Sequence, residues 1–185
     1  MTIMILSGVP GSGKTTICNR IKDNENDIEV INLGDLIYSL AKKEFPEKIN
    51  VREDTRKIPR VEYLKIQKKA AEIIRQQKKH VIVDTHLVLK TPHGYYPGLP
   101  EEILRIIKPE IICTLGNYAT SFILARFSLA SQIKGISQIH GKIFEYSDIF
   151  SKIKIIPLYH PAVATYNRNM EPVLRKDIEI ISKII

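Results

Sequence analysis

The sequence predicts an α/β fold in which a five-stranded parallel sheet is covered by helices on both faces. Short apolar segments that suit buried strands alternate with longer segments whose apolar residues recur at helical spacing. The expected strands are followed by Gly, Pro, His, Asp or Thr residues, as at the ligand-binding edge of a parallel sheet. A chain of 185 residues is long enough to bury a core around such a sheet in one domain.

The expected elements follow one another with short connections. We expect strands at residues 2–7, 28–33, 80–85, 110–115 and 154–158. We expect helices at residues 14–23, 34–45, 61–77, 101–107, 117–127 and 171–185. Gly34 and Asp35 are expected to cap the second helix. Residues 91–100 predict a turn-rich loop, and the region around Gly135 and Gly141 predicts a looser segment.

Composition narrows the class of protein. The net charge of +8 suits a polyanionic ligand, either a nucleotide or a nucleic acid. Cys18 and Cys113 are far apart, which excludes a disulfide framework and a four-cysteine metal or iron–sulfur site within this chain. The opening apolar run is too short for a signal peptide, and nothing approaches the length of a membrane span. We therefore expect a cytoplasmic protein with no iron–sulfur cluster.

A phosphate-binding loop follows the first expected strand. The run Gly8-Val9-Pro10-Gly11-Ser12-Gly13-Lys14-Thr15 matches G-x-x-x-x-G-K-[ST], with a strand before it and a helix after it. Its glycines let successive N–H groups point at phosphate oxygens, and the helix start adds its positive dipole end. Lys14 can then reach the β- and γ-phosphates, while Thr15 supplies a hydroxyl to Mg²⁺. This predicts a P-loop NTPase-like fold.

Asp84 ends the apolar third strand. In phosphate-loop proteins a strand-end Asp lies beside the loop and holds the magnesium, directly or through water. The alternative is a carboxylate that merely caps the next turn, as Asp often does after a strand. The loop upstream favours the magnesium role.

The first part of the chain resembles the archaeal type of adenylate kinase. The resemblance runs from Met1 to about Ile112. It is carried by the phosphate loop, by Arg56-Lys57 and by two distinctive runs: Val83-Asp84-Thr85-His86 and Lys90-Thr91-Pro92-His93-Gly94-Tyr95-Tyr96-Pro97-Gly98-Leu99-Pro100. It implies a kinase that transfers the γ-phosphoryl group of MgATP to AMP. No general base is needed, because the acceptor oxygen already belongs to a phosphate anion; positioning and charge neutralisation supply the catalysis.

The resemblance also implies residue roles. Lys14, Arg56 and Asp84 would be catalytic, and Thr15 and Asp84 would hold the metal. The ATP phosphates would be bound by Gly8, Val9, Pro10, Gly11, Ser12, Gly13, Lys14, Thr15 and Thr16. The monophosphate site would lie between a flap at residues 35–57 and the loop at 91–100, and would be lined by Asp35, Arg56, Thr85, His86, Thr91, Gly94, Tyr95 and Gly98.

Beyond the fourth strand the resemblance changes. The kinase family expects a mobile lid with several arginines, but this chain has only Arg126 before Arg168. Residues 111–185 instead resemble the C-terminal half of an iron–sulfur (family 4) uracil-DNA glycosylase. That resemblance is carried by Ile112-Cys113-Thr114-Leu115-Gly116-Asn117-Tyr118-Ala119-Thr120, Gly135-Ile136-Ser137, His140-Gly141-Lys142 and Ile156-Pro157-Leu158-Tyr159-His160-Pro161-Ala162. It implies contacts of Asn117 and His160 with uracil or DNA, although the family's water-holding loop and cluster cysteines are absent.

The chain therefore reads as a hybrid joined at residues 109–112. We expect residues 1–112 to form the kinase core and residues 113–185 to replace the lid while completing the same domain, with a right-handed crossover to the fifth strand. The edge at His160 would then lie near the place where the kinase family holds adenine.

Three functions remain open from the sequence. The first is a nucleoside monophosphate kinase, either active or impaired by loss of the lid arginines. The second is a glycosylase-related segment that binds DNA, and the third is an ATP-binding protein without transfer activity. The first is favoured, with ATP and AMP as partners, no membrane, and DNA as the weaker expectation. The sequence leaves undecided the preferred monophosphate, whether a homo-oligomer forms, and whether the hybrid is natural or engineered.

Overall fold

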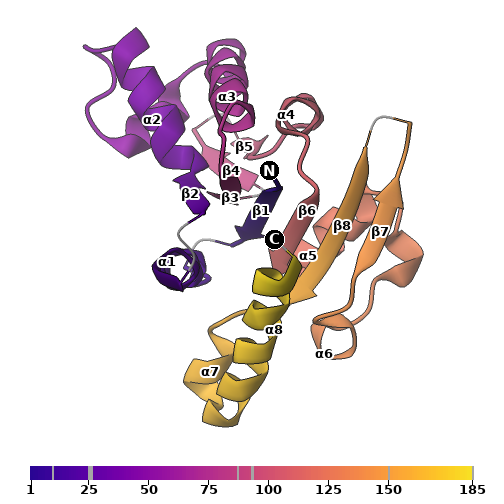
Figure 1. The fold of residues 1–185 in the computed structure, drawn as a ribbon. Coiled ribbons are helices and arrows are strands. Elements are labelled where there is room, and N and C mark those ends of the chain that lie inside the picture. The colour runs from indigo at the N-terminus through magenta and orange to yellow at the C-terminus, as the bar shows by residue number, and fades with distance from the viewer. Residues whose placement is uncertain (10, 25–26, 87, 93, 150, 185) are drawn as a thin grey trace.

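A central sheet organises the molecule (Figure 1). The computed structural model describes residues 1–184 except residues 10, 25–26, 87, 93 and 150, and it describes the backbone alone for residues 20, 23–24, 88–91, 95–96 and 182. Within those residues the sheet has six strands in the order β2-β3-β1-β6-β8-β7. The strands are β1 (Ile3–Gly8), β2 (Ile28–Asn32), β3 (His80–Thr85), β6 (Ile111–Leu115), β7 (Phe144–Ser147) and β8 (Lys152–Leu158).

The strands β2, β3, β1, β6 and β8 are mutually parallel, and β1 lies at the middle of the sheet. Ile5 of β1 is paired with Val83 of β3 on one side and with Ile112 of β6 on the other. The parallel arrangement brings the carboxyl ends of these strands to one edge, where β1 runs into the glycine loop.

Helices cover both faces because apolar side chains of the strands alternate between them. Ile3 and Ile5 point into a core that includes residues of α2 (Leu33–Glu44), α3 (Arg60–Arg75), α4 (Glu101–Ile107) and α5 (Gly116–Arg126). Met4 and Leu6 point into a second core with α1 (Lys14–Asn24) and α8 (Glu171–Ile184). The glycine loop and α1 therefore share a face of the sheet with the C-terminal helix.

Short elements complete the connections. Three are 3₁₀ turns: η1 (Arg52–Lys57), η2 (Ala130–Gln132) and η3 (Arg168–Met170). Two are single helical turns, α6 (Ile136–Ile139) and α7 (Val163–Tyr166). The strands β4 (Val88–Thr91) and β5 (Gly94–Pro97) form an antiparallel hairpin apart from the main sheet.

The predicted α/β fold is confirmed, with corrections in detail. The sheet has a sixth strand, β7, which runs antiparallel to β8 at the edge. Its alternating half-buried and exposed residues span only Phe144–Ser147, a signal too short to stand out in the sequence. The turn-rich loop expected at residues 91–100 contains β5, which pairs with β4 just before it. Helix α2 begins at Leu33 rather than after Gly34 and Asp35, because Asn32 is its N-cap.

The C-terminal part of the chain belongs to the same sheet. Residues 111–115 of β6 pair in parallel with residues 154–158 of β8. The segment that follows the expected junction at residues 109–112 therefore adds two strands, β8 and β7, to the sheet that carries the glycine loop. The division into parts at residues 112 and 113 stays a prediction.

Candidate functional site

The loop between β1 and α1 has the backbone geometry that its glycines predict. Gly11 and Gly13 both have φ of 76°, a left-handed conformation that glycine adopts without strain. A side chain at Gly8 would place its Cβ 2.8 Å from Ser12 Oγ and 3.0 Å from Leu115 Cβ, so this position is closed to larger residues. The loop thus has little room for any residue but glycine at its start.

Lys14 lies along the inside of this loop. Its Nζ donates to the carbonyl oxygens of Gly8 at 3.3 Å and Val9 at 3.1 Å and to Ser12 Oγ at 3.2 Å. Burial lowers the pKa of Lys14 from its ordinary value of 10.5, while the nearby Asp84 carboxylate acts in the opposite direction. Phosphate oxygens that entered the loop would offer this ammonium group stronger, charged acceptors.

Asp84 lies at the end of β3 with one oxygen bonded and one not. Its Oδ2 accepts from Asn32 Nδ2 at 2.8 Å. Its Oδ1 is buried and has no hydrogen-bond partner among the residues that the structure describes. An unpaired oxygen of a buried carboxylate is costly, and a cation would relieve that cost. Together with Thr15, which lines the same cavity, this donor set suits Mg²⁺.

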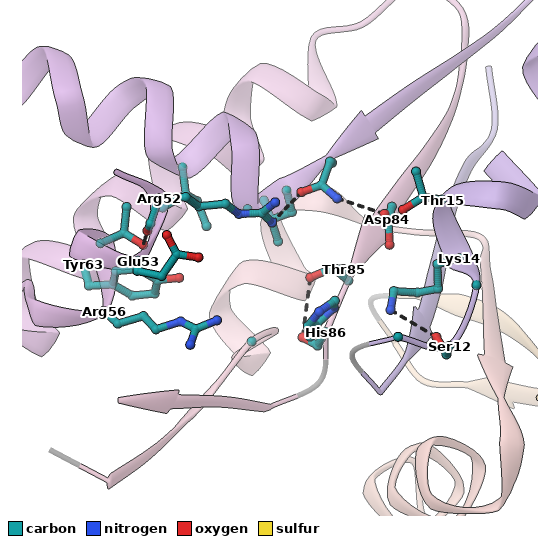
Figure 2. Close-up of a pocket in the computed structure, with 18 residues that line it drawn as sticks. Ser12, Lys14, Thr15, Arg52, Glu53, Arg56, Tyr63, Asp84, Thr85 and His86 are labelled. Atoms are coloured by element: carbon teal, nitrogen blue, oxygen red, sulfur yellow. Dashed lines mark hydrogen bonds between the residues drawn. The ribbon is translucent and has the colours of Figure 1, made fainter. Parts of the chain in front are cut away.

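A single cavity of about 570 Å³ joins the loop to the opposite end of the site (Figure 2). Lys14 and Thr15 line one end, Asp84 and His86 its middle, and Arg52, Arg56 and Tyr63 the other end. Gly34, at the start of α2, also lines this cavity. Cationic side chains thus stand at both ends, with a carboxylate between them, which is an arrangement that suits two phosphate-bearing ligands placed end to end.

The far end of the cavity is formed by η1 and the start of α3. Arg52 pairs with Asp35 Oδ1 at 2.8 Å and donates to Asn32 Oδ1 at 2.8 Å. Figure 2 shows Arg56 extending from η1 toward His86. Burial raises the pKa of Tyr63 to about 12, so its hydroxyl stays protonated at this end of the cavity.

The match to a protein-family model decides the family. A model described as an AAA domain matches residues 7–126, which is well over half of the chain. The chain belongs to this AAA-domain family. The match begins at the end of β1 and continues through α5, so it includes the phosphate loop, Asp84 and the whole cavity lining. It also crosses residues 109–112, the junction that the sequence suggested, without interruption.

This AAA-domain chain is similar to several curated adenylate kinases. It is 44% identical over 124 residues to an adenylate kinase of Pyrobaculum aerophilum, a match that covers 66% of this chain and 61% of the relative. It is 36% identical over 116 residues to an adenylate kinase of Methanocaldococcus jannaschii, covering 60% and 59%. An adenylate kinase of Thermoplasma acidophilum is 44% identical over 103 residues, covering 56% and 54%. The chain thus spans roughly three fifths of the length of these relatives.

Most of the predicted kinase residues of this AAA-domain chain gather in the cavity. Its lining includes the predicted residues Gly11, Ser12, Gly13, Lys14, Thr15, Arg56, Asp84, Thr85, His86 and Gly98. Gly8 and Val9 contribute carbonyl oxygens to Lys14 instead. Thr16 lines a neighbouring cavity, and Asp35 pairs with Arg52 rather than lining the site. Pro10 lies outside the described residues, as do the side chains of Thr91 and Tyr95, and Gly94 is exposed in the hairpin.

Several residues that line the cavity were not among the predicted site residues. Those with polar side chains that bear on the site include Asn32, Arg52 and Tyr63. Asn32 could have been found, because an Asn before a helical run is a strong N-cap signal. Arg52 carried no signal, since the 3₁₀ turn that turns it toward Asn32 has no distinct sequence pattern.

The two residues predicted to contact uracil or DNA each accept a hydrogen bond from the backbone of the chain. Asn117 Oδ1 accepts from the backbone N–H of Ile136 at 2.7 Å, which ties α5 to α6. His160 Nδ1 accepts from the N–H of Ala162 at 3.2 Å. Burial, and secondarily the Lys14 cation, lower the pKa of His160 below its ordinary value of 6.5. His160 therefore stands near the phosphate loop as a neutral ring, and the uracil roles of both residues stay predictions.

The segment after β8 packs against the phosphate loop. A Cβ at Gly13 would lie 3.2 Å from Pro161 Cβ, and one at Gly116 would lie 3.2 Å from His160 Cβ. Between this segment, α1 and α8 lies a second cavity of about 260 Å³. Its lining includes Gly13, Ile17 and Pro161, and from α8 the apolar Leu174 and Ile178 and the charged Glu171, Arg175 and Asp177. The two cavities share Gly13 in their lining, so the second opens beside the loop.

Among the described residues, none of the helices has the length and apolar character needed to cross a lipid bilayer. Nor does any group of three or more His, Cys, Asp or Glu side chains in the described part of the chain form a metal-binding cluster. A magnesium site here would have to draw most of its ligands from nucleotide phosphates and water, which is the usual arrangement for that ion.

Proposed function

We propose that this protein is a nucleoside monophosphate kinase that transfers the γ-phosphoryl group of MgATP to AMP. The observation that carries the proposal is the continuous cavity with Lys14 at one end, Arg52 and Arg56 at the other, and Asp84 between them. Its charge pattern suits a triphosphate and a monophosphate meeting near Asp84. The adenylate kinase names of the relatives support the same class.

Each part of the cavity has a task in this proposal. The loop amides and Lys14 bind the β- and γ-phosphates, and Arg56 binds the acceptor phosphate. Thr15 and Asp84 hold Mg²⁺, which supplies neutralisation of charge on the transferred group. The apolar cavity beside Gly13 and Pro161 suits the adenine ring of the donor.

We also propose that transfer is slow. The cavity lining has its cations on the loop and on η1, and the described residues after β6 do not contribute to that lining. Arginines that stabilise the transferring phosphoryl group are worth about 10³–10⁵ in rate. A chain without lid arginines should lose a comparable factor in the rate of transfer, although its phosphate loop can still bind ATP.

The proposal is tested by following ADP formation from ATP and AMP. We expect turnover in the presence of magnesium that falls by about 10²-fold or more in Lys14→Ala, because the charge on the γ-phosphate then lacks its main cationic contact. Equal rates for the two proteins, each no faster than the reaction without protein, would refute transfer activity. Substituting other monophosphates for AMP defines the preferred acceptor.

Neither alternative is favoured by a specific observation. A glycosylase-like origin for residues 111–185 has no support from the comparisons, and the family model runs through its expected start to residue 126. DNA binding and self-association are likewise unsupported. A protein that binds ATP without transfer would retain the loop but would have no use for the two arginines at the far end of the cavity.

A further inference from the structure

One side chain connects the two ends of the candidate site. Asn32 is the last residue of β2 and the N-cap of α2. Its Oδ1 accepts from Asp35 N at 3.1 Å and from Arg52 Nη2 at 2.8 Å, and its Nδ2 donates to Asp84 Oδ2 at 2.8 Å. Figure 2 shows the two dashed lines that join Arg52 to Asp84 through this amide.

The neighbours of Asn32 fix the orientation of its amide group. A backbone N–H and a guanidinium face one end of the amide, and a carboxylate faces the other. A flipped amide would set its NH₂ against two donors and its oxygen against a carboxylate oxygen, losing all of these bonds. Asn32 therefore must donate to Asp84.

This donation determines which oxygen of Asp84 remains available. Oδ2 is occupied by Asn32, while the buried Oδ1 has no partner among the described residues. We propose that Asn32 is a positioning residue that orients Asp84 for magnesium and, by also holding Arg52, connects that carboxylate to the acceptor end of the site. The inference rests on the proposed function, since it assigns a task to Asn32 within the same site.

At the acceptor end of the cavity, Arg52 is held weakly enough to exchange its partners for a phosphate. Its ion pair with Asp35 is between two half-exposed side chains, and solvent screening leaves such exposed pairs little net stabilising energy. An acceptor phosphate, with two negative charges, can compete for the guanidinium. Gly34 makes room for this arrangement, because a Cβ at that position would collide with the guanidinium of Arg52.

The test measures nucleotide binding rather than turnover. The variant Asn32→Ser keeps an oxygen that caps α2 but has no donor that reaches Asp84. Calorimetry with a non-hydrolysable ATP analogue, with and without magnesium, gives the gain in affinity that the metal confers. We expect that gain to fall by about 10- to 100-fold in Asn32→Ser, the usual cost of removing a partner that orients a metal ligand. The affinity without magnesium should stay as in the wild type.

The matched control is Gly34→Ala. Its methyl group displaces Arg52 but leaves Asn32 in place against Asp84. We expect this variant to keep the magnesium gain and to bind AMP more weakly. Thermal unfolding of each protein separates loss of fold from loss of positioning. If Asn32→Ser unfolds, Asn32→Thr replaces it, because a threonine oxygen also caps a helix and its hydroxyl is likewise too short to reach Asp84.

The outcomes separate the inference from the proposed function. If magnesium raises the affinity for the analogue equally in the wild type and in Asn32→Ser, the inference is overturned and the kinase proposal stands. A wild-type protein whose affinity for the analogue is the same with and without magnesium overturns both, since Asp84 then orients no cation. The inference is supported if magnesium no longer raises the affinity for the analogue in Asn32→Ser but still raises it in Gly34→Ala.

Discussion

At the scale of single residues, the two arginines of η1 differ in how they are held. Arg52 is tied to Asp35 and Asn32. Arg56 forms no such bond among the described residues, and Figure 2 shows it reaching into the cavity toward His86. Arg52 thus has to exchange partners before it meets a ligand, whereas Arg56 can meet one directly. The contact of the acceptor phosphate should depend most on Arg56.

Replacing Arg56 with alanine should therefore weaken binding of the acceptor. A hydrogen bond to a charged group is worth about 1.5–3 kcal/mol. Since about 1.4 kcal/mol corresponds to a tenfold change, the KM for AMP should rise by about 10- to 100-fold while the KM for ATP stays the same. Steady-state kinetics with each substrate varied in turn measures both values.

The control for this variant is Arg60→Ala, which removes an exposed arginine at the start of α3 that does not line the cavity. It carries the same change in net charge. An equal rise in the KM for AMP in both variants would show that overall charge, rather than a contact of Arg56, governs acceptor binding.

At the scale of elements, the buried carboxylate of Asp177 attaches α8 to the rest of the fold. Asp177 accepts from His140 Nδ1 at 2.9 Å and from the backbone N–H of Tyr159 at 3.1 Å. These bonds join α8 to the residues that follow α6 and β8. Helix α8 also lines the cavity beside the phosphate loop, so its attachment determines the shape of that cavity.

Removing this carboxylate should destabilise the protein. In Asp177→Ala, the N–H of Tyr159 and the ring of His140 both lose their acceptor, and an unsatisfied buried donor costs about 1–3 kcal/mol. For a protein of this size each kcal/mol lowers the Tm by about 2–4 °C. Calorimetric unfolding should show a clear fall in Tm for Asp177→Ala.

The matched variant Glu179→Ala removes an exposed carboxylate from the same helix. Its free energy of unfolding should stay within about 0.5 kcal/mol of the wild-type value. If both variants unfold at the wild-type temperature, Asp177 does not fasten the helix.

The elements that the sequence predicted well are those with strong apolar patterns. The five parallel strands and the helices that cover them were expected from runs of buried residues, such as Ile3 to Leu6 in β1. Strand β7 was missed because its four residues have no such run. The site residues in the motif, Lys14 and Thr15, were expected because spacing alone defines the loop. Asn32 and Arg52 were not, because their role depends on where β2 ends and how η1 turns.

At the scale of the whole molecule, nucleotide binding should raise the stability of the chain. The phosphate loop lies against the segment after β8 at Gly13 and Pro161. A ligand bound in the loop should therefore stabilise both the loop and this later segment. A ligand that binds only the folded state stabilises it by about 2.7 kcal/mol at one hundred times its Kd.

With about 2–4 °C for each kcal/mol, saturating MgATP analogue should raise the Tm by about 5–11 °C. Thermal unfolding with increasing analogue measures the shift, and Lys14→Ala should reduce it strongly. If the analogue produced no shift in the wild type, both the kinase and the simpler ATP-binding function would be wrong.

The central position of β1 has a consequence for how the protein is made. This strand is synthesised before its two neighbours in the sheet, β3 and β6, which end at Thr85 and Leu115. Contacts between residues so distant in the chain form slowly, because a long loop must close before they contribute. The nascent chain must therefore carry β1 without its full set of strand partners until Leu115 has been synthesised. We expect cells that overproduce this chain to need more chaperone as its synthesis rate rises. Slower translation beyond Leu115 should bring little benefit to the pairing of β1, because both partner strands have then been made.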